Sequence, residues 1–382
     1  MKRVLSLVLA AIMAASALAG CGGSKPAAPS EAPAPSAESA AEPTADSASA
    51  PAADGKNITV VFVPKLTGNA FFESANDGAQ AYAEKIGFTV KYDGSPEASV
   101  ANQVTVINNA IQQGADAICV SSVDATGLDD VMKQAKEAGL QVVTWDSDVS
   151  GDARTVMVSQ GTPDILGKML VEMSVKSLTS RGKDPKKDAI NYCWHYSQAT
   201  VADQNSWQVA GEAYIKENYA NWVNVAPDNY YSEQDAEKAI SVGESILSAH
   251  KDIDLIICND SAALPGQCQA GKNLGLKKED VTITGFASPN SIKDYCKAGV
   301  IERWGLWDCQ IQGALGCYLA YHLASGNTLK VGDKIDVPDI GTVEVLPNTV
   351  LDTNAYTAED SGVVLLPERA EFTAENMDNY NF

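Results

Sequence analysis

Residues 57–92 read NITVVFVPKLTGNAFFESANDGAQAYAEKIGFTVKY and contain a strand, a helix and a second strand in that order. Residues 58–63 form a short apolar run rich in β-branched side chains, which favours a buried strand. Residues 72–86 have the apolar spacing of a helix, and residues 89–92 are again strand-like. Because buried strands joined through helices form parallel sheets covered on both faces, this stretch predicts an α/β fold.

The same alternation continues beyond this unit and then starts a second time. The first series continues with helix 100–113, strand 117–120, helix 128–138 and strand 141–145. The second series has strands at 189–194, 223–226, 255–258, 281–284 and 301–307, with helices at 205–218, 235–249, 266–274, 292–297 and 311–325. We therefore expect an α/β protein of two similar lobes, each built on a doubly wound parallel sheet.

The N-terminal residues have the composition of an export signal followed by a linker. A basic start at residues 2–3 precedes an apolar stretch, and Leu-Ala-Gly-Cys then ends at Cys21. This order predicts a lipoprotein signal peptide over residues 1–20 and a lipidated Cys21, with a plain secretory signal as the alternative. Residues 21–56, rich in Ala, Pro and Ser, are expected to form a disordered tether. We expect the protein outside the cytoplasm, anchored on the outer face of the cytoplasmic membrane or in the periplasm.

Composition argues against several classes of protein. The 28 Lys and Arg against 49 Asp and Glu give a formal charge of −21, which disfavours nucleic-acid binding. No apolar run after the signal approaches the ~18 residues that span a bilayer, so the lipid is the expected membrane contact. With three scattered His and no Cys-x-x-Cys, we expect neither a metal nor another cofactor. No nucleophile elbow, P-loop or dinucleotide motif occurs, so we expect a binding protein rather than an enzyme, a glycosidase carboxylate pair being the enzymatic alternative.

Polar and aromatic side chains recur where the expected strands end, and open α/β sheets bind ligands at those carboxyl ends. The candidate site residues are Lys65, Asn69, Phe71, Phe72, Trp145, Asp146, Asp203, Gln204, Asn259, Ser261 and Trp307. Carboxylates accept hydrogen bonds from hydroxyls, lysine and amides donate them, and aromatic faces cover the C–H groups of a ring. The set therefore predicts a site for a small polyhydroxylated ligand.

Structural roles remain open as alternatives for most of these residues. They are a helix N-cap for Asp146, Asp203 and Asn259, a surface position for Lys65 and Gln204, and a core position for Phe71 or Phe72. Asp148, by contrast, is assigned to a turn.

A series of short motifs carries a resemblance to a known family. They include Val63-Pro64-Lys65-Leu66, Trp145-Asp146-Ser147-Asp148, Gln160-Gly161-Thr162-Pro163, Thr200-Val201-Ala202-Asp203-Gln204 and Gly305-Leu306-Trp307-Asp308. With these motifs the chain resembles the type I periplasmic binding proteins of ABC importers, and more specifically the LsrB-type receptors for the signal autoinducer-2. The resemblance extends over residues 58–382.

This resemblance implies that Lys65, Asp146, Asp203 and Gln204 hold a cyclic, tetrahydroxylated furan form of autoinducer-2. It also implies delivery of the ligand to an ABC permease by a monomeric protein. The run Asn259-Asp260-Ser261 departs from the Pro-Asp-Ala of the best-known members, and Asn69 is likewise more similar to sugar binders. A monosaccharide such as rhamnose or ribose is therefore the alternative ligand, and relay to a sensor kinase is the alternative to import.

The resemblance further implies three crossings between the lobes, near residues 158–160, near 307–309, and after helix 311–325. We expect an N-terminal lobe of residues 57–158 plus about 309–336, and a C-terminal lobe of residues 159–308 plus about 337–382. The three crossing segments are expected to form a hinge that closes the lobes on the ligand.

Overall fold

The computed structural model describes residues 57–382, so the expected signal peptide, Cys21 and the tether lie outside the described residues. Within residues 57–382, the larger sheet has seven strands in the order β14-β15-β5-β4-β3-β1-β2, parallel except for β14. Its strands are β1 (Thr59–Val63), β2 (Thr89–Tyr92), β3 (Ala117–Val120), β4 (Gln141–Trp145), β5 (Val156–Ser159), β14 (Leu346–Pro347) and β15 (Gly362–Leu365).

A second parallel sheet follows the order β10-β9-β6-β7, with β8 also pairing with β6. Its strands are β6 (Ile190–Tyr196), β7 (Trp222–Asn224), β8 (Tyr230–Tyr231), β9 (Leu255–Cys258) and β10 (Thr282–Gly285). Two antiparallel pairs complete the described strands: β11 (Trp304–Leu306) with β16 (Ala370–Phe372), and β12 (Lys334–Val337) with β13 (Gly341–Glu344).

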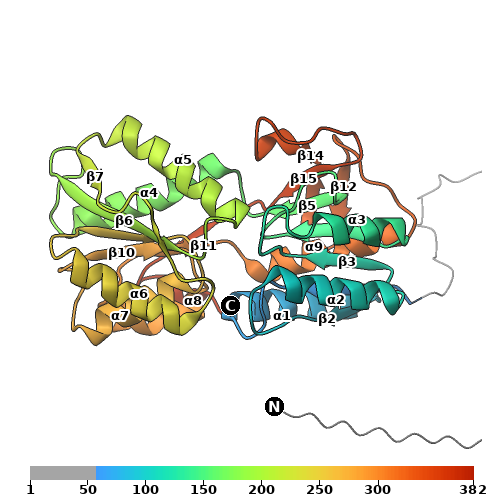
Figure 1. The fold of residues 1–382 in the computed structure, drawn as a ribbon, viewed down its shortest axis with the longest axis horizontal. Coiled ribbons are helices and arrows are strands. Elements are labelled where there is room, and N and C mark those ends of the chain that lie inside the picture. The colour runs from blue at the N-terminus through green and yellow to red at the C-terminus, as the bar shows by residue number, and fades with distance from the viewer. Residues whose placement is uncertain (1–56) are drawn as a thin grey trace, which may run out of the picture. The chain divides into compact units, whose positions relative to one another are not determined.

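Helices cover both faces of each large sheet (Figure 1). The helices of the first lobe are α1 (Ala70–Ile86), α2 (Val100–Gln112), α3 (Asp129–Glu137) and α9 (Cys309–Ala324). Those of the second lobe are α4 (Pro163–Ser180), α5 (Ala202–Asn218), α6 (Ala236–Ala249), α7 (Ala263–Asn273) and α8 (Pro289–Lys297), and two 3-10 turns occupy Asn348–Val350 and Met377–Asn379. In Figure 1, α4 and α5 lie on one side of the second sheet and α6 and α7 on the other.

Strand β1 shows why its sequence is apolar throughout. Val60 and Phe62 point into the core shared with α1 and α9, whereas Val61 and Val63 point into the core shared with α2 and α3. Successive strand residues face opposite sides, and here both sides are covered, so every position is buried. The strand ends at Val63, two residues before Lys65.

Strand pairing corrects one expected boundary. The expectation that residues from about 337 onward belong to the C-terminal lobe is wrong up to Leu365, because β15 pairs in parallel with β5 in the first sheet. The chain returns to the second lobe only between β15 and β16, since β16 pairs with β11. The other crossings of the described chain join β5 to α4 and β11 to α9, where they were expected.

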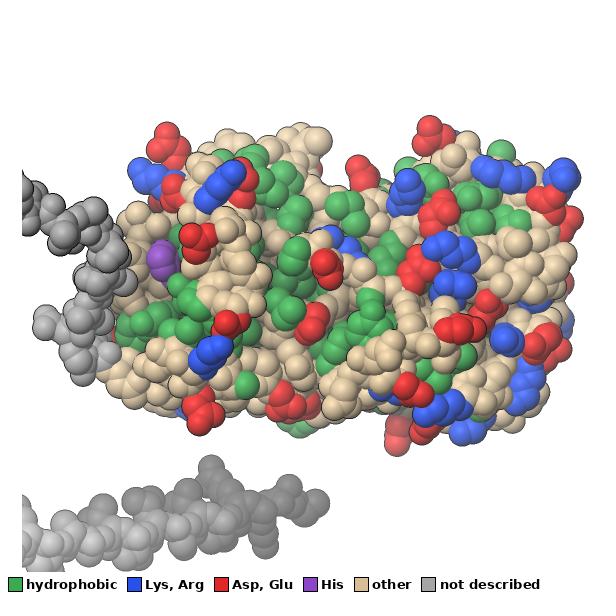
Figure 2. Space-filling model, turned by 180° about the vertical axis from the view of Figure 1, so that it is seen from behind, with side chains coloured by type: hydrophobic (Ala, Val, Ile, Leu, Met, Phe, Trp, Pro, Cys, Tyr) green, Lys and Arg blue, Asp and Glu red, His purple; other side chains and the backbone are tan. Residues whose placement is uncertain are grey.

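The surface agrees with the acidic composition. On the face shown in Figure 2, acidic and basic side chains are interspersed, and hydrophobic side chains lie between them. A nucleic-acid-binding surface requires clustered basic side chains, and this face presents no such cluster in the described part of the chain.

Candidate ligand-binding site

A small cavity lies where strands of both lobes end. The space between the atoms at this site, including its opening to solvent, is about 320 Å³. Its lining residues are Lys65, Phe71, Phe72, Asp146, Gln204, Trp207, Gln234, Asn259, Asp260, Ser261, Phe286, Leu306 and Trp307. Lys65, Phe71, Phe72 and Asp146 come from the first lobe. The other lining residues come from the second lobe or from the crossing at Trp307, so the cavity lies between the lobes.

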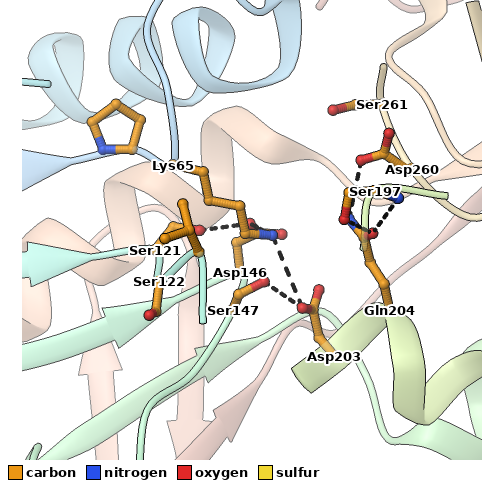
Figure 3. A network of polar contacts seen from close by, with 12 residues as sticks. Lys65, Ser121, Ser122, Asp146, Ser147, Ser197, Asp203, Gln204, Asp260 and Ser261 are labelled. Carbon is orange, nitrogen blue, oxygen red and sulfur yellow. Dashed lines mark hydrogen bonds and ion pairs between the residues drawn. The ribbon is translucent and has the colours of Figure 1, made fainter. Parts of the chain in front are cut away.

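Lys65 is the centre of the charged part of the site, as Figure 3 shows. Its side chain is 2% exposed, and Nζ lies 3.0 Å from Asp146 Oδ2 and 3.9 Å from Asp203 Oδ1. Asp146 comes from the first lobe and Asp203 from the first turn of α5 in the second lobe. A single ammonium group therefore links carboxylates of both lobes.

Serine side chains hold these two carboxylates in place. Ser121 Oγ donates to Asp146 Oδ2 at 2.7 Å, and Ser147 Oγ donates to Asp203 Oδ1 across the lobes. Asp146 follows β4 with a left-handed φ of 60°, which is uncommon for a residue other than glycine. Gln160 Nε2 donates to the Asp146 carbonyl at 3.0 Å, so the crossing segment after β5 supports this turn.

Burial and charge together set the protonation of the cluster. Burial raises the pKa of Asp203 to about 6, with the Asp146 carboxylate adding to the shift and the Lys65 ammonium opposing it. Burial also acts to lower the pKa of Lys65, but the Asp146 and Asp203 carboxylates outweigh it and raise that pKa. Lys65 is therefore charged at neutral pH, and Asp203 changes its protonation near pH 6.

Gln204 is held on the opposite side of the cavity (Figure 3). Its Oε1 accepts from the Ser197 hydroxyl and its Nε2 donates to Asp260 Oδ2 at 3.1 Å. Asp260 in turn accepts from the backbone N–H groups of Ala262 and Ala263, and burial raises its pKa. Since a carboxamide has two N–H groups, the orientation fixed here leaves one N–H of Gln204 for a ligand.

Aromatic rings form the apolar walls. Trp307 makes edge contacts with Phe71, Trp207 and Phe286 at centroid distances of 5.6–5.9 Å. Trp307 is itself fixed by a 2.6 Å hydrogen bond from Nε1 to Gln312 in α9. Such walls suit the C–H faces of a ring and keep water away from the polar contacts.

The structure places most of the predicted side chains on this cavity. Lys65, Phe71, Phe72, Asp146, Gln204, Asn259, Ser261 and Trp307 line it. Trp145 does not, because it is fully buried and stacks on Phe62 and Phe71, at ring-centroid distances of 4.5 and 6.0 Å. Trp145 therefore supports Phe71, and its ligand contact stays a prediction.

Asn69 and Asp203 also lie outside the cavity lining. Asn69 is the N-cap of α1, accepting from Phe71 N–H, and it accepts from Ser261 Oγ at 3.3 Å across the cleft. Asp203 belongs to the site through its approach to Lys65. The capping alternatives do not hold for Asp203 or Asn259, because the N-cap of α5 is Val201 and the side chain that accepts at the start of α7 is Asp260. Asp148 forms an ion pair with buried Arg154.

Five residues that line the cavity were absent from the predicted set: Trp207, Gln234, Asp260, Phe286 and Leu306. Trp207 lies one helical turn after Asp203 on α5, so helical spacing was an available signal. Gln234 follows β8, a strand of two residues that no sequence pattern indicated. Asp260 stands between two residues that were predicted, at the end of β9.

Residues 57–382 present neither a metal-binding cluster nor a membrane-spanning helix. No group of three or more His, Cys, Asp or Glu side chains in that range is arranged to hold a metal ion. No helix in the same range has the length and apolar character needed to cross a membrane.

Comparison with known proteins shows the family to which the chain belongs. A family model described as "Periplasmic binding protein domain" matches residues 60–328. The structure of LsrB from Clostridium saccharobutylicum in complex with AI-2 is 68% identical, with a TM-score of 0.84, over 85% of this chain and 100% of that one. A solute-binding protein from Clostridium phytofermentas with bound L-rhamnose has a TM-score of 0.75 at 20% identity, over 85% and 98% of the two chains, and shows the shared fold.

Curated relatives are more distant. The D-ribose/D-allose-binding protein of Pseudomonas aeruginosa is 24% identical over 70% of this chain and 83% of that protein. The ribose import binding protein RbsB of Salmonella typhimurium is 25% identical over 73% of this chain and 89% of that protein. The family match and these relatives confirm the prediction of a binding protein rather than an enzyme. With two thirds of its length matched by the family model and 68% identity to a solved LsrB, the chain belongs to the periplasmic binding protein family, in its LsrB-type branch.

Proposed function

We propose that this protein captures autoinducer-2, in its cyclic tetrahydroxylated form, between its lobes and delivers it to the permease of an ABC importer. The observation that carries the proposal is the buried set of Lys65, Asp146, Asp203 and Gln204 beside a cavity of about 320 Å³. The 68% identity to LsrB in complex with AI-2 supports the same ligand.

The chemistry of the site suits a small neutral polyol. The carboxylates of Asp146 and Asp203 accept from ligand hydroxyls, while Lys65 and the remaining N–H of Gln204 donate to ligand oxygens. The rings of Phe71 and Trp307 cover the C–H groups of the furan. When the ligand binds, each buried polar group exchanges a hydrogen bond with water for one with the ligand. A ring without hydroxyls would leave these groups unpaired, so the site rejects it.

A monosaccharide such as ribose or rhamnose is the second candidate ligand. Two observations favour it: distant relatives bind ribose, and Asn259 and Ser261 replace the Pro and Ala of the best-known autoinducer-2 receptors. Both residues line the cavity, and Asn259 Oδ1 is buried without a partner in the described chain. Asn259 Nδ2 donates to the Gln204 carbonyl at 2.8 Å, which ties this position to the ligand-binding helix α5.

The family indicates the compartment in which the protein acts, whereas the membrane anchor is a separate proposal. Periplasmic binding proteins act outside the cytoplasm, and this chain is extracytoplasmic. We further propose that cleavage after Gly20 exposes Cys21 for lipidation, so that residues 21–56 link the lobes to the membrane. Mass spectrometry of the protein purified from its native membrane tests this, because an unmodified Cys21 would exclude the anchor.

The ligand is identified by releasing it from the protein. We expect the purified mature chain to release autoinducer-2 on heating, because a closed cavity retains a bound ligand through purification. Mass spectrometry of the released fraction detects it, and Asp146→Asn, which removes the carboxylate 3.0 Å from Lys65, serves as the control that should release far less. A pentose or deoxyhexose in place of autoinducer-2 would select the sugar alternative.

A further inference from the structure

Gln234 lies at the ligand cavity on a short segment that the second sheet positions. Tyr230 and Tyr231 of β8 pair in parallel with His195 and Tyr196 at the end of β6. Glu233 N–H then donates to the Ser197 carbonyl at 2.8 Å, which holds the next residue beside the loop that carries Gln204. Gln234 is therefore placed at the carboxyl end of the second sheet, where such sheets bind ligands.

The backbone at this point is strained. Glu233 and Gln234 have φ values of 54° and 63°, so two consecutive residues other than glycine adopt the left-handed region. Each such residue is disfavoured by about 1–2 kcal/mol. Asp235 continues the constraint, because it caps α6 by accepting from Lys238 N–H. The fold maintains an unfavourable conformation that directs the Gln234 side chain to the cavity.

The carboxamide of Gln234 has no partner within the described chain. The residue is 5% exposed and lines the cavity, yet both Nε2 and Oε1 lack a hydrogen bond among residues 57–382. A buried polar group left unpaired destabilises a protein by about 1–3 kcal/mol. Gln204, by contrast, uses both ends of its amide for protein contacts.

A hydroxylated ring is the partner that satisfies both ends. Each hydroxyl donates one hydrogen bond and accepts others, so neighbouring hydroxyls can pair with Oε1 and Nε2 of one carboxamide. A charged ligand group would satisfy only one end. We propose, on the basis of the function proposed above, that Gln234 is a ligand-binding residue of the second lobe, accepting from one ring hydroxyl and donating to another ring oxygen.

The test is Gln234→Met, which keeps the length and volume of the side chain but removes both polar atoms. Calorimetry with autoinducer-2, ribose and rhamnose measures the affinity of the mature chain, and thermal unfolding without ligand measures its stability. We expect the affinity for whichever ligand the wild type binds to fall at least tenfold, while stability without ligand is unchanged or higher. Gln134→Met, on the exposed side of α3, is the control and should alter neither.

A purely structural role predicts the reverse pattern, with lower stability and unchanged affinity, and that result would overturn the assignment. If the wild type binds ribose or rhamnose instead of autoinducer-2, the proposed ligand is wrong, but the Gln234→Met comparison with that sugar still decides the role of Gln234. Binding of none of the three probes by the wild type would contradict both.

Discussion

The ammonium group of Lys65 faces carboxylates of both lobes, at 3.0 Å from Asp146 and 3.9 Å from Asp203. A buried ion pair between charges of opposite sign is stable only if the remaining polar atoms are also paired. Here the serines at positions 121 and 147 complete the pairing. Two carboxylates share one ammonium group, however, so negative charge is in excess. Asp203, whose pKa is raised to about 6, therefore takes up a proton near that pH. In the function proposed above, ligand hydroxyls would relieve this by donating hydrogen bonds to the carboxylates.

Asp203 makes ligand affinity depend on pH. Because burial raises the pKa of Asp203 to about 6, we expect affinity for autoinducer-2 to decrease as pH falls below about 6, when the accepting carboxylate is protonated. Asp203→Asn should bind about 10–100-fold more weakly at pH 7.5, as expected for one charged hydrogen bond, and should lose most of this pH dependence. Calorimetry at pH 5, 6 and 7.5 measures both effects.

The same shift has a consequence for stability without ligand. Between pH 4 and 6 the folded chain holds more protons at Asp203 than the unfolded chain does, so the free energy of unfolding decreases as pH rises through that range. Asp203→Asn should remove the part of this dependence that Asp203 contributes and leave the part from Asp260, whose pKa is also raised. Asp152→Asn, at an exposed ion pair with Lys133, is the matched control. Identical pH profiles for wild type and Asp203→Asn would contradict the assignment.

Among the elements, α1 and α9 pack with almost no space between their backbones. A methyl group added at Gly313 of α9 would lie 2.1 Å from the Ala75 carbonyl oxygen, and one at Gly78 of α1 would lie 2.3 Å from the Gln310 oxygen. The helices therefore touch through glycine at both points. This contact positions the site, because Phe71 and Phe72 begin α1 and Trp307 precedes α9.

Separating these helices should destabilise the protein and weaken binding together. We expect Gly313→Ala to lower the free energy of unfolding by about 1–3 kcal/mol, since overpacking outweighs the helical preference for alanine. Gly271→Ala on α7 is the matched control, because its methyl group would make ordinary contacts of 3.4 Å with Ile283 and Val300. Urea unfolding compares the two. Equal stability of both variants would show that α1 can move away from α9 without cost.

Sequence patterns predicted the bounds of helices and strands more accurately than they predicted which strands pair with one another. Strands 89–92, 117–120, 141–145 and 255–258 have the bounds that were predicted, because each is a short apolar run with polar residues or glycine around it. Strand β5 and helix α4 were not predicted, although Thr162 and Pro163 supply an N-cap and a first-turn proline. The place of β15 beside β5 depends on pairing between distant segments, which local composition does not encode.

The candidate site was predicted to a similar extent. Side chains that directly follow strand ends could be found, because the topology rule names those positions. Gln234 could not be found in this way, because its position depends on a left-handed backbone at Glu233 and Gln234. Neither Glu nor Gln is a residue type that indicates this conformation. Trp145 also follows the rule for strand ends, but it is the last residue of β4 and packs in the core against Phe62 and Phe71, so its ligand contact stays a prediction.

At the scale of the whole described chain, three crossing segments connect the lobes and further contacts join them across the cleft. Arg369 links two of the crossings, since its guanidinium donates to the carbonyls of Gln160 and Leu366 at 2.5 and 2.9 Å. Away from the cavity, Ala125 N–H donates to the Thr200 carbonyl at 3.1 Å. Gln198 Nε2 donates to the Val123 carbonyl at 3.2 Å, again from one lobe to the other. The bonds of Ala125 and Gln198 run from one lobe to the other, so we expect them to favour a closed form without contacting the ligand.

Gln198 therefore offers a way to change closure while the cavity stays intact. A neutral hydrogen bond contributes about 1 kcal/mol, so Gln198→Ala should shift the equilibrium toward the open form about fivefold. Because affinity scales with the population of the closed form, we expect calorimetry to show a two- to fivefold loss for autoinducer-2, mainly through faster dissociation. Gln80→Ala is the control, since Gln80 Nε2 donates to the Val90 carbonyl at the same 3.2 Å but within one lobe. Small-angle scattering with and without ligand should show a larger radius of gyration for unliganded Gln198→Ala than for wild type, and equal radii once ligand is saturating. An equal loss of affinity in Gln80→Ala would mean that general destabilisation, rather than closure, explains the effect.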